Sequence, residues 1–149
     1  MCRAHAAVRS LLRELLDAAT DVAVADMEAG LENFSRGTPR HSDTVISVVE
    51  PYYRSLETGA RVVELARELG VPRVHVVANK IRDEGDREAV AAFCQARGLE
   101  LFGSLPHDTA VLEADRSQAA LLDWAPESPA VTAMTALALR LLAPATATA

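Results

Sequence analysis

Residues 44–50 read Thr-Val-Ile-Ser-Val-Val-Glu, and residues 73–78 read Arg-Val-His-Val-Val-Ala. Each stretch is a nearly continuous run of apolar, mostly β-branched residues, as expected for a strand that is covered on both faces. Between the two stretches, Ser55 is placed to cap a helix and Gly70 to end it. A strand, a helix and a second strand at this spacing predict a parallel β-α-β unit, so the sequence indicates the α/β class.

The same alternation continues on both sides of this unit. The other expected elements are a helix over residues 2–17, a strand over 21–26, a polar loop over 27–43, a helix over 85–97, a strand over 99–102 and a helix that begins at Pro129. The inner face of the 85–97 helix is assigned to Ala89, Ala92, Phe93 and Ala96. We therefore expect a mostly parallel sheet flanked by helices, in one domain over residues 1–142, with a disordered small-residue tail over 143–149.

Composition limits the classes of function. The chain has 149 residues, a net charge of −6 and 50% hydrophobic residues, so it can bury a core but lacks the basic surface of a nonspecific nucleic-acid binder. Cys2 and Cys94 are its two cysteines, which indicates no disulfide framework and favours a reduced, cytoplasmic setting. No apolar run approaches the roughly 20 residues that span a bilayer, so no membrane partner is expected.

Four residues lie at or just beyond the carboxyl ends of the expected strands: Asp26, Glu50, Asn79 and Pro106. In parallel α/β sheets, ligands bind at this edge. Asp26 follows the apolar run 22–25 and is followed by Gly30. An Asp in this position can hold the water shell of a magnesium ion, and a glycine backbone can approach a terminal phosphate. The alternative is an ordinary strand-end Asp that opens a turn.

Two further motifs belong to the same edge. Asn79 can both donate to and accept from a purine, and the stem of Lys80 can lie over a base; the alternative is a solvated strand end. The turn formed by Pro106, His107 and Asp108 can present backbone groups to a base, or be a plain turn. Lys80 is the chain's one lysine, and no Gly-x-x-x-x-Gly-Lys-Ser/Thr phosphate-binding loop is present.

The cysteines and nucleophiles give weaker signals. Cys2 and His5 lie three residues apart at the start of the expected helix, so they share a face and could ligate a soft metal ion, although two ligands do not make a site. The alternative is an incidental thiol. Cys94 is expected in or near the core. No Gly-x-Ser-x-Gly motif occurs, so nucleophilic catalysis finds little support.

Taken together, these residues resemble the carboxyl-terminal two thirds of a MinD/ParA-type P-loop ATPase. Within that superfamily they are similar to the CooC-type accessory ATPases of carbon monoxide dehydrogenase. The resemblance runs from about residue 2 to residue 115. The strings that carry it are residues 26–38 (DMEAGLENFSRGT), 48–51 (VVEP), 54–58 (RSLET), 77–80 (VANK), 105–108 (LPHD) and 113–115 (EAD).

The resemblance implies a role for each of these positions. Asp26 would hold the magnesium shell as the catalytic residue, and Gly30 would sense the γ-phosphate of ATP. Asn79 and Lys80 would contact the adenine, helped by the turn at Pro106 and Asp108. Cys2 would bind Ni²⁺ or Zn²⁺ at a homodimer interface, and the client would be a nickel enzyme.

The departures from the family pattern shape the expected function. The phosphate-binding loop, its strand and its lysines are absent from the 149 residues, so we expect a truncated nucleotide-binding domain that does not hydrolyse ATP by itself. In the family's sheet, the missing strand would lie between the 21–26 strand and the 44–50 strand. The sequence leaves two alternatives: a non-catalytic module that dimerises with a full-length ATPase, or an unrelated flavodoxin-like or receiver-like domain.

Overall fold

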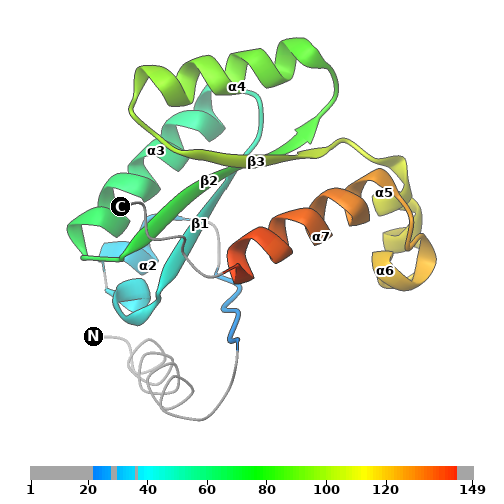
Figure 1. Ribbon diagram of the computed structural model, residues 1–149, viewed down its shortest axis with the longest axis horizontal. Coiled ribbons are helices and arrows are strands. Elements are labelled where there is room, and N and C mark those ends of the chain that lie inside the picture. The colour runs from blue at the N-terminus through cyan, green and yellow to red at the C-terminus, as the bar shows by residue number, and fades with distance from the viewer. Residues whose placement is uncertain (1–21, 28–29, 36, 144–149) are drawn as a thin grey trace.

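The computed structural model describes residues 22–27, 30–35 and 37–143. Its centre is a parallel sheet of three strands in the order β1 (Thr44–Val49), β2 (Arg73–Ile81) and β3 (Leu101–Pro106). Helices α3 (Tyr53–Glu68) and α4 (Glu84–Ala96) pack on one face, and α7 (Pro129–Leu142) packs against β3 on the other (Figure 1). The expected α/β class and the parallel sheet flanked by helices are therefore confirmed.

Four short helices complete the described part. They are α2 (Glu32–Ser35), the 3₁₀ helix η1 (Thr38–His41), α5 (Thr109–Arg116) and α6 (Leu121–Trp124). The stretch expected as a polar loop thus contains α2 and η1, and it buries Phe34 and Pro39. None of the described helices is both long and apolar enough to cross a membrane.

The core lies between the sheet and the pair α3–α4. In β1, Val45 and Val49 are buried on this side, and Val76 follows them in β2. Gly59 of α3 has no side chain to separate the helix from the strand: a Cβ there would lie 2.2 Å from Cγ1 of Val49. This close contact fixes where α3 sits on the sheet.

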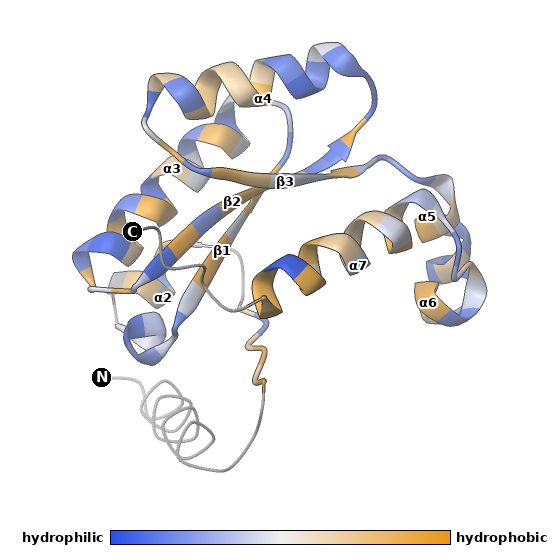
Figure 2. Cartoon of the chain, in the orientation of Figure 1, coloured by the Kyte–Doolittle hydropathy of each residue, from blue (hydrophilic) through white to orange (hydrophobic). Residues whose placement is uncertain are grey.

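Helix α7 covers the β3 side of the opposite face. It begins at Pro129, and the hydroxyl of Ser128 accepts a hydrogen bond from the Val131 N–H, as at a helix N-cap. The Arg140 guanidinium lies 4.2 Å from the centre of the Phe102 ring, a cation–π contact between α7 and β3. Figure 2 shows apolar residues along both the central strands and α7.

Strand β1 is less well covered. Ile46 and Val48 point away from α3, and Val48 is 58% exposed. Among the described residues, β2 is the only strand that pairs with β1. One edge of β1 and one of its faces are therefore open in the described part of the chain.

The expected strand over residues 21–26 is wrong where the structure describes it. Residues 22–27 form no strand, and Val24 is 91% exposed. An apolar sequence becomes a strand only when a neighbour accepts its backbone hydrogen bonds. In the described residues neither β1 nor another strand pairs with this stretch, so its apolar side chains remain in solvent.

The remaining boundaries are corrected by a few residues. Helix α3 begins two residues before Ser55, and the Ser55 hydroxyl accepts the Glu50 N–H instead of capping the helix. Strand β2 runs three residues beyond Ala78, and β3 occupies residues 101–106 instead of 99–102. The helix over 85–97 and the helix beginning at Pro129 are confirmed within one residue.

The predicted inner face of α4 is confirmed at Phe93, which is partly buried and packs against the core, and is wrong at the alanines. Its buried residues are Val90 and Cys94, whereas Ala89 and Ala92 are exposed. The physical reason is size, because burying a Val removes more apolar area from water than burying an Ala does, so the helix is rotated to place Val90 inward. The expectation of Cys94 in the core is confirmed.

Candidate functional site

The carboxyl ends of the three strands form one rim of the sheet. Val49 pairs with Ala78 at the ends of β1 and β2, and Ile81 pairs with Pro106 at the ends of β2 and β3. The next residues along the chain, Glu50 after β1 and His107 after β3, therefore lie on the same edge. We call Glu50, Asn79, Lys80, Pro106 and Asp108 the rim residues.

Asn79 and Lys80 occupy an irregular point in β2. The register between β2 and β3 shifts between Ala78 and Ile81, so these two residues lie outside the regular ladder. Lys80 has φ of 57°, a left-handed conformation that is uncommon for a residue with a side chain. The Asn79 carbonyl oxygen Oδ1 accepts the Lys80 N–H at 2.9 Å, which supports this turn of the backbone.

Glu50 reaches Lys80 from the neighbouring strand end. The Lys80 ammonium Nζ lies 2.8 Å from Glu50 Oε1, so an ion pair bridges the ends of β1 and β2. The hydrogen bond to Glu50, followed by its negative charge, raises the pKa of Lys80 above its usual value. The Glu50 N–H itself donates to Ser55 Oγ at 2.9 Å, which holds the backbone of Glu50 against the first turn of α3.

The turn after β3 is fixed by Asp108. One carboxylate oxygen accepts the Ala110 N–H at the start of α5, and the other accepts the Ala130 N–H at the start of α7, both at 3.0 Å. The bond from Ala130 first, then the bond from Ala110, lowers the pKa of Asp108. Both carboxylate oxygens thus hold the first turns of two helices, and the His107 N–H donates to the Ile81 carbonyl at 2.8 Å to close the turn.

The structure does not bring Asp26 and Gly30 to the rim by any contact among the described residues. Asp26 is exposed in the irregular stretch over residues 22–27, and it makes no hydrogen bond or ion pair within residues 22–27, 30–35 and 37–143. Gly30 is exposed and has φ of 146°, which a glycine adopts without strain. Cys2, the predicted metal ligand, lies outside the described residues.

The described residues do not fit a bound metal ion. No group of three or more His, Cys, Asp or Glu side chains in the described ranges is arranged to hold one. The implied Mg²⁺ would need ligands beyond Asp26, and the sequence has no phosphate-binding loop to supply the serine or threonine ligand. We therefore derive no phosphate chemistry from this part of the chain.

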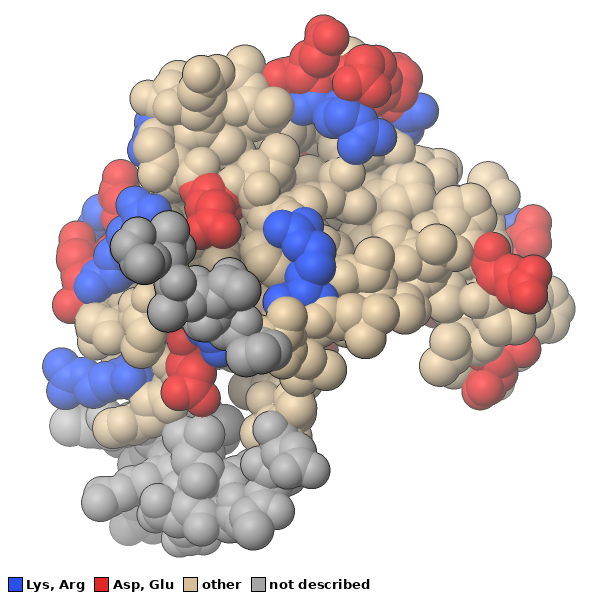
Figure 3. Space-filling view, in the orientation of Figure 1, with Lys and Arg blue, Asp and Glu red and all other residues tan. Residues whose placement is uncertain are grey.

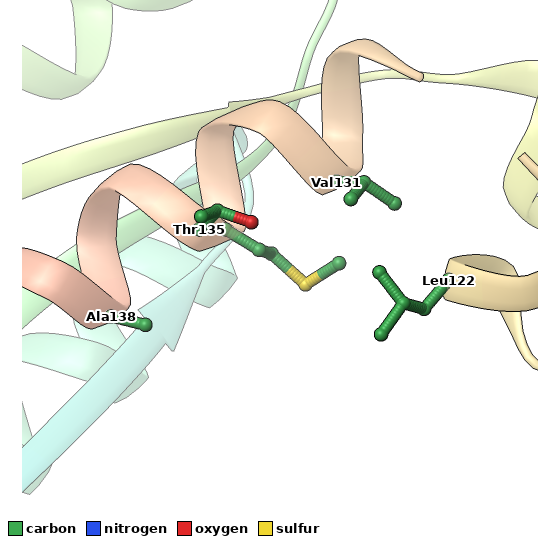
Figure 4. A pocket seen from close by; sticks show the side chains of 5 residues that line it. Leu122, Val131, Thr135 and Ala138 are labelled. Carbon is green, nitrogen blue, oxygen red and sulfur yellow. The ribbon is translucent and has the colours of Figure 1, made fainter. Parts of the chain in front are cut away.

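An apolar hollow of about 240 Å³ lies elsewhere, between α6 and α7. Leu122 points toward Val131 across it (Figure 4), and Met134 is a further lining residue. None of the rim residues lines this hollow. In Figure 3 the face over α7 is mostly uncharged, with acidic and basic side chains gathered over α4 and at the edge of the molecule near α3.

Two features of the rim were not predicted from the sequence. The sequence predicts that Glu50 lies on the rim, but it does not predict the ion pair with Lys80. A contact between residues thirty positions apart leaves no local signal in the sequence. The type and position of Ser55 predict a helix cap, whereas its actual bond to Glu50 depends on where α3 begins.

Solved structures share this fold. MinD of Aquifex aeolicus superposes with a TM-score of 0.73 at 19% identity and covers 94% of this chain, which spans 61% of that one. A ParA-family ATPase of Chlorobium tepidum superposes with a TM-score of 0.67 at 20% identity over 87% of this chain and 54% of its own. The chain therefore has the fold of the MinD/ParA-type P-loop ATPases.

Proteins with similar sequences indicate which members of this class the chain resembles. The chain resembles the carbon monoxide dehydrogenase accessory protein CooC of Rhodospirillum rubrum, with 38% identity over 126 residues, 85% of this chain and 47% of that protein. It is also 37% identical to an uncharacterized ATP-binding protein of Methanocaldococcus jannaschii, over 77% of this chain and 45% of the relative. The chain thus spans about half the length of these curated relatives. No protein-family model matches it.

Proposed function

We propose that this chain is the base-binding part of an ATP-binding accessory protein of the MinD/ParA superfamily. The observation that carries the proposal is the rim at which Asn79 and a left-handed Lys80 lie beside the turn at Pro106, in a chain 38% identical to CooC. The side-chain oxygen Oδ1 of Asn79 accepts the Lys80 N–H, whereas the side-chain NH₂ group of Asn79 is not used in that bond. The NH₂ group can therefore donate to a purine. The methylene stem of Lys80 offers an apolar surface to a base.

Nucleotide titration tests this proposal. We expect ATP and ADP to shift the backbone NMR signals of Asn79 and Lys80 in the 149-residue chain at millimolar concentration, and Asn79→Ala to weaken the interaction. Glu88→Gln, an exposed change on the outer side of α4, is the control and should leave binding unchanged. Binding that Asn79→Ala leaves unaltered would place the nucleotide elsewhere.

We also propose that this chain alone does not hydrolyse ATP. Phosphoryl transfer depends on a lysine and backbone amides that stabilise the developing charge, and the printed sequence contains no phosphate-binding loop. A phosphate-release assay with Mg²⁺ should therefore give no turnover above background. Turnover that persists through further purification would contradict this expectation.

The resemblance to CooC supports a proposal for the cellular role. We propose a cytoplasmic accessory protein in metallocentre maturation, with a nickel enzyme as client and Ni²⁺ or Zn²⁺ held at a dimer interface by Cys2. The test is equilibrium dialysis of the chain against Ni²⁺, with and without Cys2→Ser. Loss of bound metal in the variant supports the assignment, and equal binding by the two proteins excludes Cys2.

The open side of β1 favours a second candidate function. Within the described residues, β1 is an edge strand with an exposed Val48, and such an edge can accept a further strand. As an alternative, we propose that the chain is a non-catalytic module that pairs with a longer ATPase of the same family. The phosphate-loop strand of that partner would lie along β1. Co-expression with such a paralogue followed by size-exclusion chromatography tests it: co-elution supports the pairing, and separate elution contradicts it.

A further inference from the structure

Glu50 lies just beyond the end of β1, and its side chain reaches across the rim to Lys80 of β2. Its carboxylate and the Lys80 ammonium form the direct side-chain link between the ends of β1 and β2 within the described residues. Because Lys80 starts on β2 and its ammonium is held at the end of β1, its four-carbon stem crosses the rim between the two strands. Without Glu50, a lysine that is 56% exposed would be free to sample many rotamers in solvent.

Both ends of this link are fixed. At the β1 end, the Glu50 N–H is bonded to Ser55 Oγ, and the Glu50 carbonyl accepts the Tyr52 N–H at 2.8 Å. At the β2 end, Asn79 holds the Lys80 N–H, and the backbone of Lys80 stays in its left-handed conformation. The ion pair therefore joins two rigid points, so it sets where the stem of Lys80 lies.

We propose that Glu50 is a positioning residue for base binding: it holds Lys80 across the rim so that the lysine stem forms the surface on which a purine lies. The inference rests on the proposed nucleotide-binding function and names a residue that acts in it only through Lys80. Contact with a methylene stem does not distinguish adenine from guanine, so Glu50 sets affinity for purine nucleotides in general. Selectivity between adenine and guanine depends instead on the side-chain amide of Asn79.

A binding cycle tests this role. We expect Glu50→Gln to weaken ADP and GDP binding by the same factor, about three- to fivefold, the effect of losing one exposed ion pair. In a Lys80→Met background, Glu50→Gln should have no further effect, because the residue through which it acts is gone. Glu64→Gln is the matched control: it removes the same charge from an exposed ion pair on α3, away from the rim, and should change nothing.

A spectroscopic measurement follows the same pair without depending on affinity. Lys80 is the chain's one lysine, so ¹⁵N-lysine labelling gives one side-chain ammonium signal. We expect Glu50→Gln to shift this signal and lower its titration midpoint in the free protein, and ADP to shift it in the wild type and less so in the variant. Glu64→Gln should leave it in place.

The outcomes separate the two proposals. If the wild type binds no nucleotide, the proposed function fails, and the inference fails with it. If the wild type binds ADP and Glu50→Gln binds equally well, or if the effect of Glu50→Gln persists in Lys80→Met, the nucleotide proposal stands and the positioning role of Glu50 is overturned. A factor that differs between ADP and GDP would make Glu50 a direct base contact instead.

Discussion

At the scale of single residues, the fold depends on two glycines that lie where a helix contacts a strand closely. Gly59 brings α3 against β1, and Gly103 brings β3 against α7, where a Cβ would lie 2.5 Å from Cδ2 of Leu137. The two positions differ in what a methyl group would meet. Leu137 can rotate its side-chain end, whereas Val49 is β-branched and buried and has little room to move.

Gly59→Ala should therefore destabilise the protein. Overpacking against Val49 costs about 1–3 kcal/mol, which outweighs the gain of up to about 1 kcal/mol from replacing a helical glycine with alanine. Urea denaturation measures the difference. Gly85→Ala in the first turn of α4 is the control, since it is exposed and meets only Asp83, and it should be neutral or stabilising. Equal effects at the two positions would contradict the packing argument.

Asp108 makes stability depend on pH. Its pKa is lowered in the folded protein by the N–H groups of Ala130 and Ala110, so the unfolded chain binds a proton more readily than the folded chain does. The contribution of Asp108 to the free energy of unfolding is fully present above about pH 3.9, the pKa of an Asp in the unfolded chain. This contribution is lost as the pH falls from that value through the lower pKa of Asp108 in the folded protein.

We therefore expect Asp108→Asn to be less stable than the wild type at pH 7, and the gap between the two to narrow as the pH falls below about 4. Urea midpoints measured from pH 7 to acid check this. Asp123→Asn, an exposed residue of α6, serves as the control for removing one carboxylate. A gap that stays constant with pH would mean that the charge of Asp108 does not matter.

At the scale of elements, the pattern of apolar residues predicts which segments are helices better than which way they face. Helix α4 lies within one residue of its expected bounds, but its buried stripe is Val90 and Cys94 instead of the alanines. Alanine carries little burial energy, so in an alanine-rich helix the few larger side chains decide the rotation.

This rotation predicts a clear contrast within α4. Val90 has no exposed surface, so Val90→Ala should cost about 2 kcal/mol through lost burial and the cavity it leaves. Ala92→Ser, on the exposed side, should change stability by less than about 0.5 kcal/mol. Thermal or urea unfolding of both variants is the measurement. A larger loss of stability in Ala92→Ser than in Val90→Ala would mean that the alanines form the buried face of α4.

Strands show the limit of sequence reasoning more sharply. Residues 44–49 and 22–25 are equally apolar, yet only the first stretch forms a strand among the described residues. The difference lies in the partner: β1 pairs with β2, whereas residues 22–25 have no pairing neighbour in the part of the chain that the structure describes. A strand is a property of two segments, so one segment's sequence cannot decide it.

At the scale of the whole molecule, the sheet is covered unevenly. Helices α3 and α4 close one face, while α7 contacts β3 on the other and leaves Ile46 and Val48 of β1 exposed. Such a combination of open edge and apolar face favours association of the isolated chain. We expect concentration-dependent oligomers by light scattering; a monodisperse monomer with a sharp thermal melt would contradict this.

Two neighbouring valines in β1 separate this surface effect from the core. Val48→Thr should reduce association and leave the free energy of unfolding nearly unchanged, because Val48 lies on the open face. Val49→Thr buries a hydroxyl against α3 and should cost about 1–3 kcal/mol. Light scattering and urea denaturation on both variants check the contrast, and similar losses of stability would mean that Val48 is covered in solution.

The candidate site was predicted in part. Strand-end position alone placed Asn79 and Pro106 on one rim, because parallel strands align their carboxyl ends. The left-handed turn at Lys80 and its bond to Glu50 depend on the register shift of β2 and on contacts between distant segments. Those details arise only when the strands are assembled, so no local pattern carries them.

The scarcity of lysine has a practical consequence for handling this protein. Positive charge elsewhere is carried by arginine, so Lys80 presents the chain's one side-chain primary amine, and more than half of that side chain is exposed. Amine-reactive dyes, crosslinkers and activated sensor surfaces react with the α-amino group of the chain and with this one side chain, so their side-chain attachment lies at the strand-end rim. A chain immobilised in that way has its candidate binding surface against the support, so tethering through an engineered tag at the carboxyl terminus is the better choice for binding measurements.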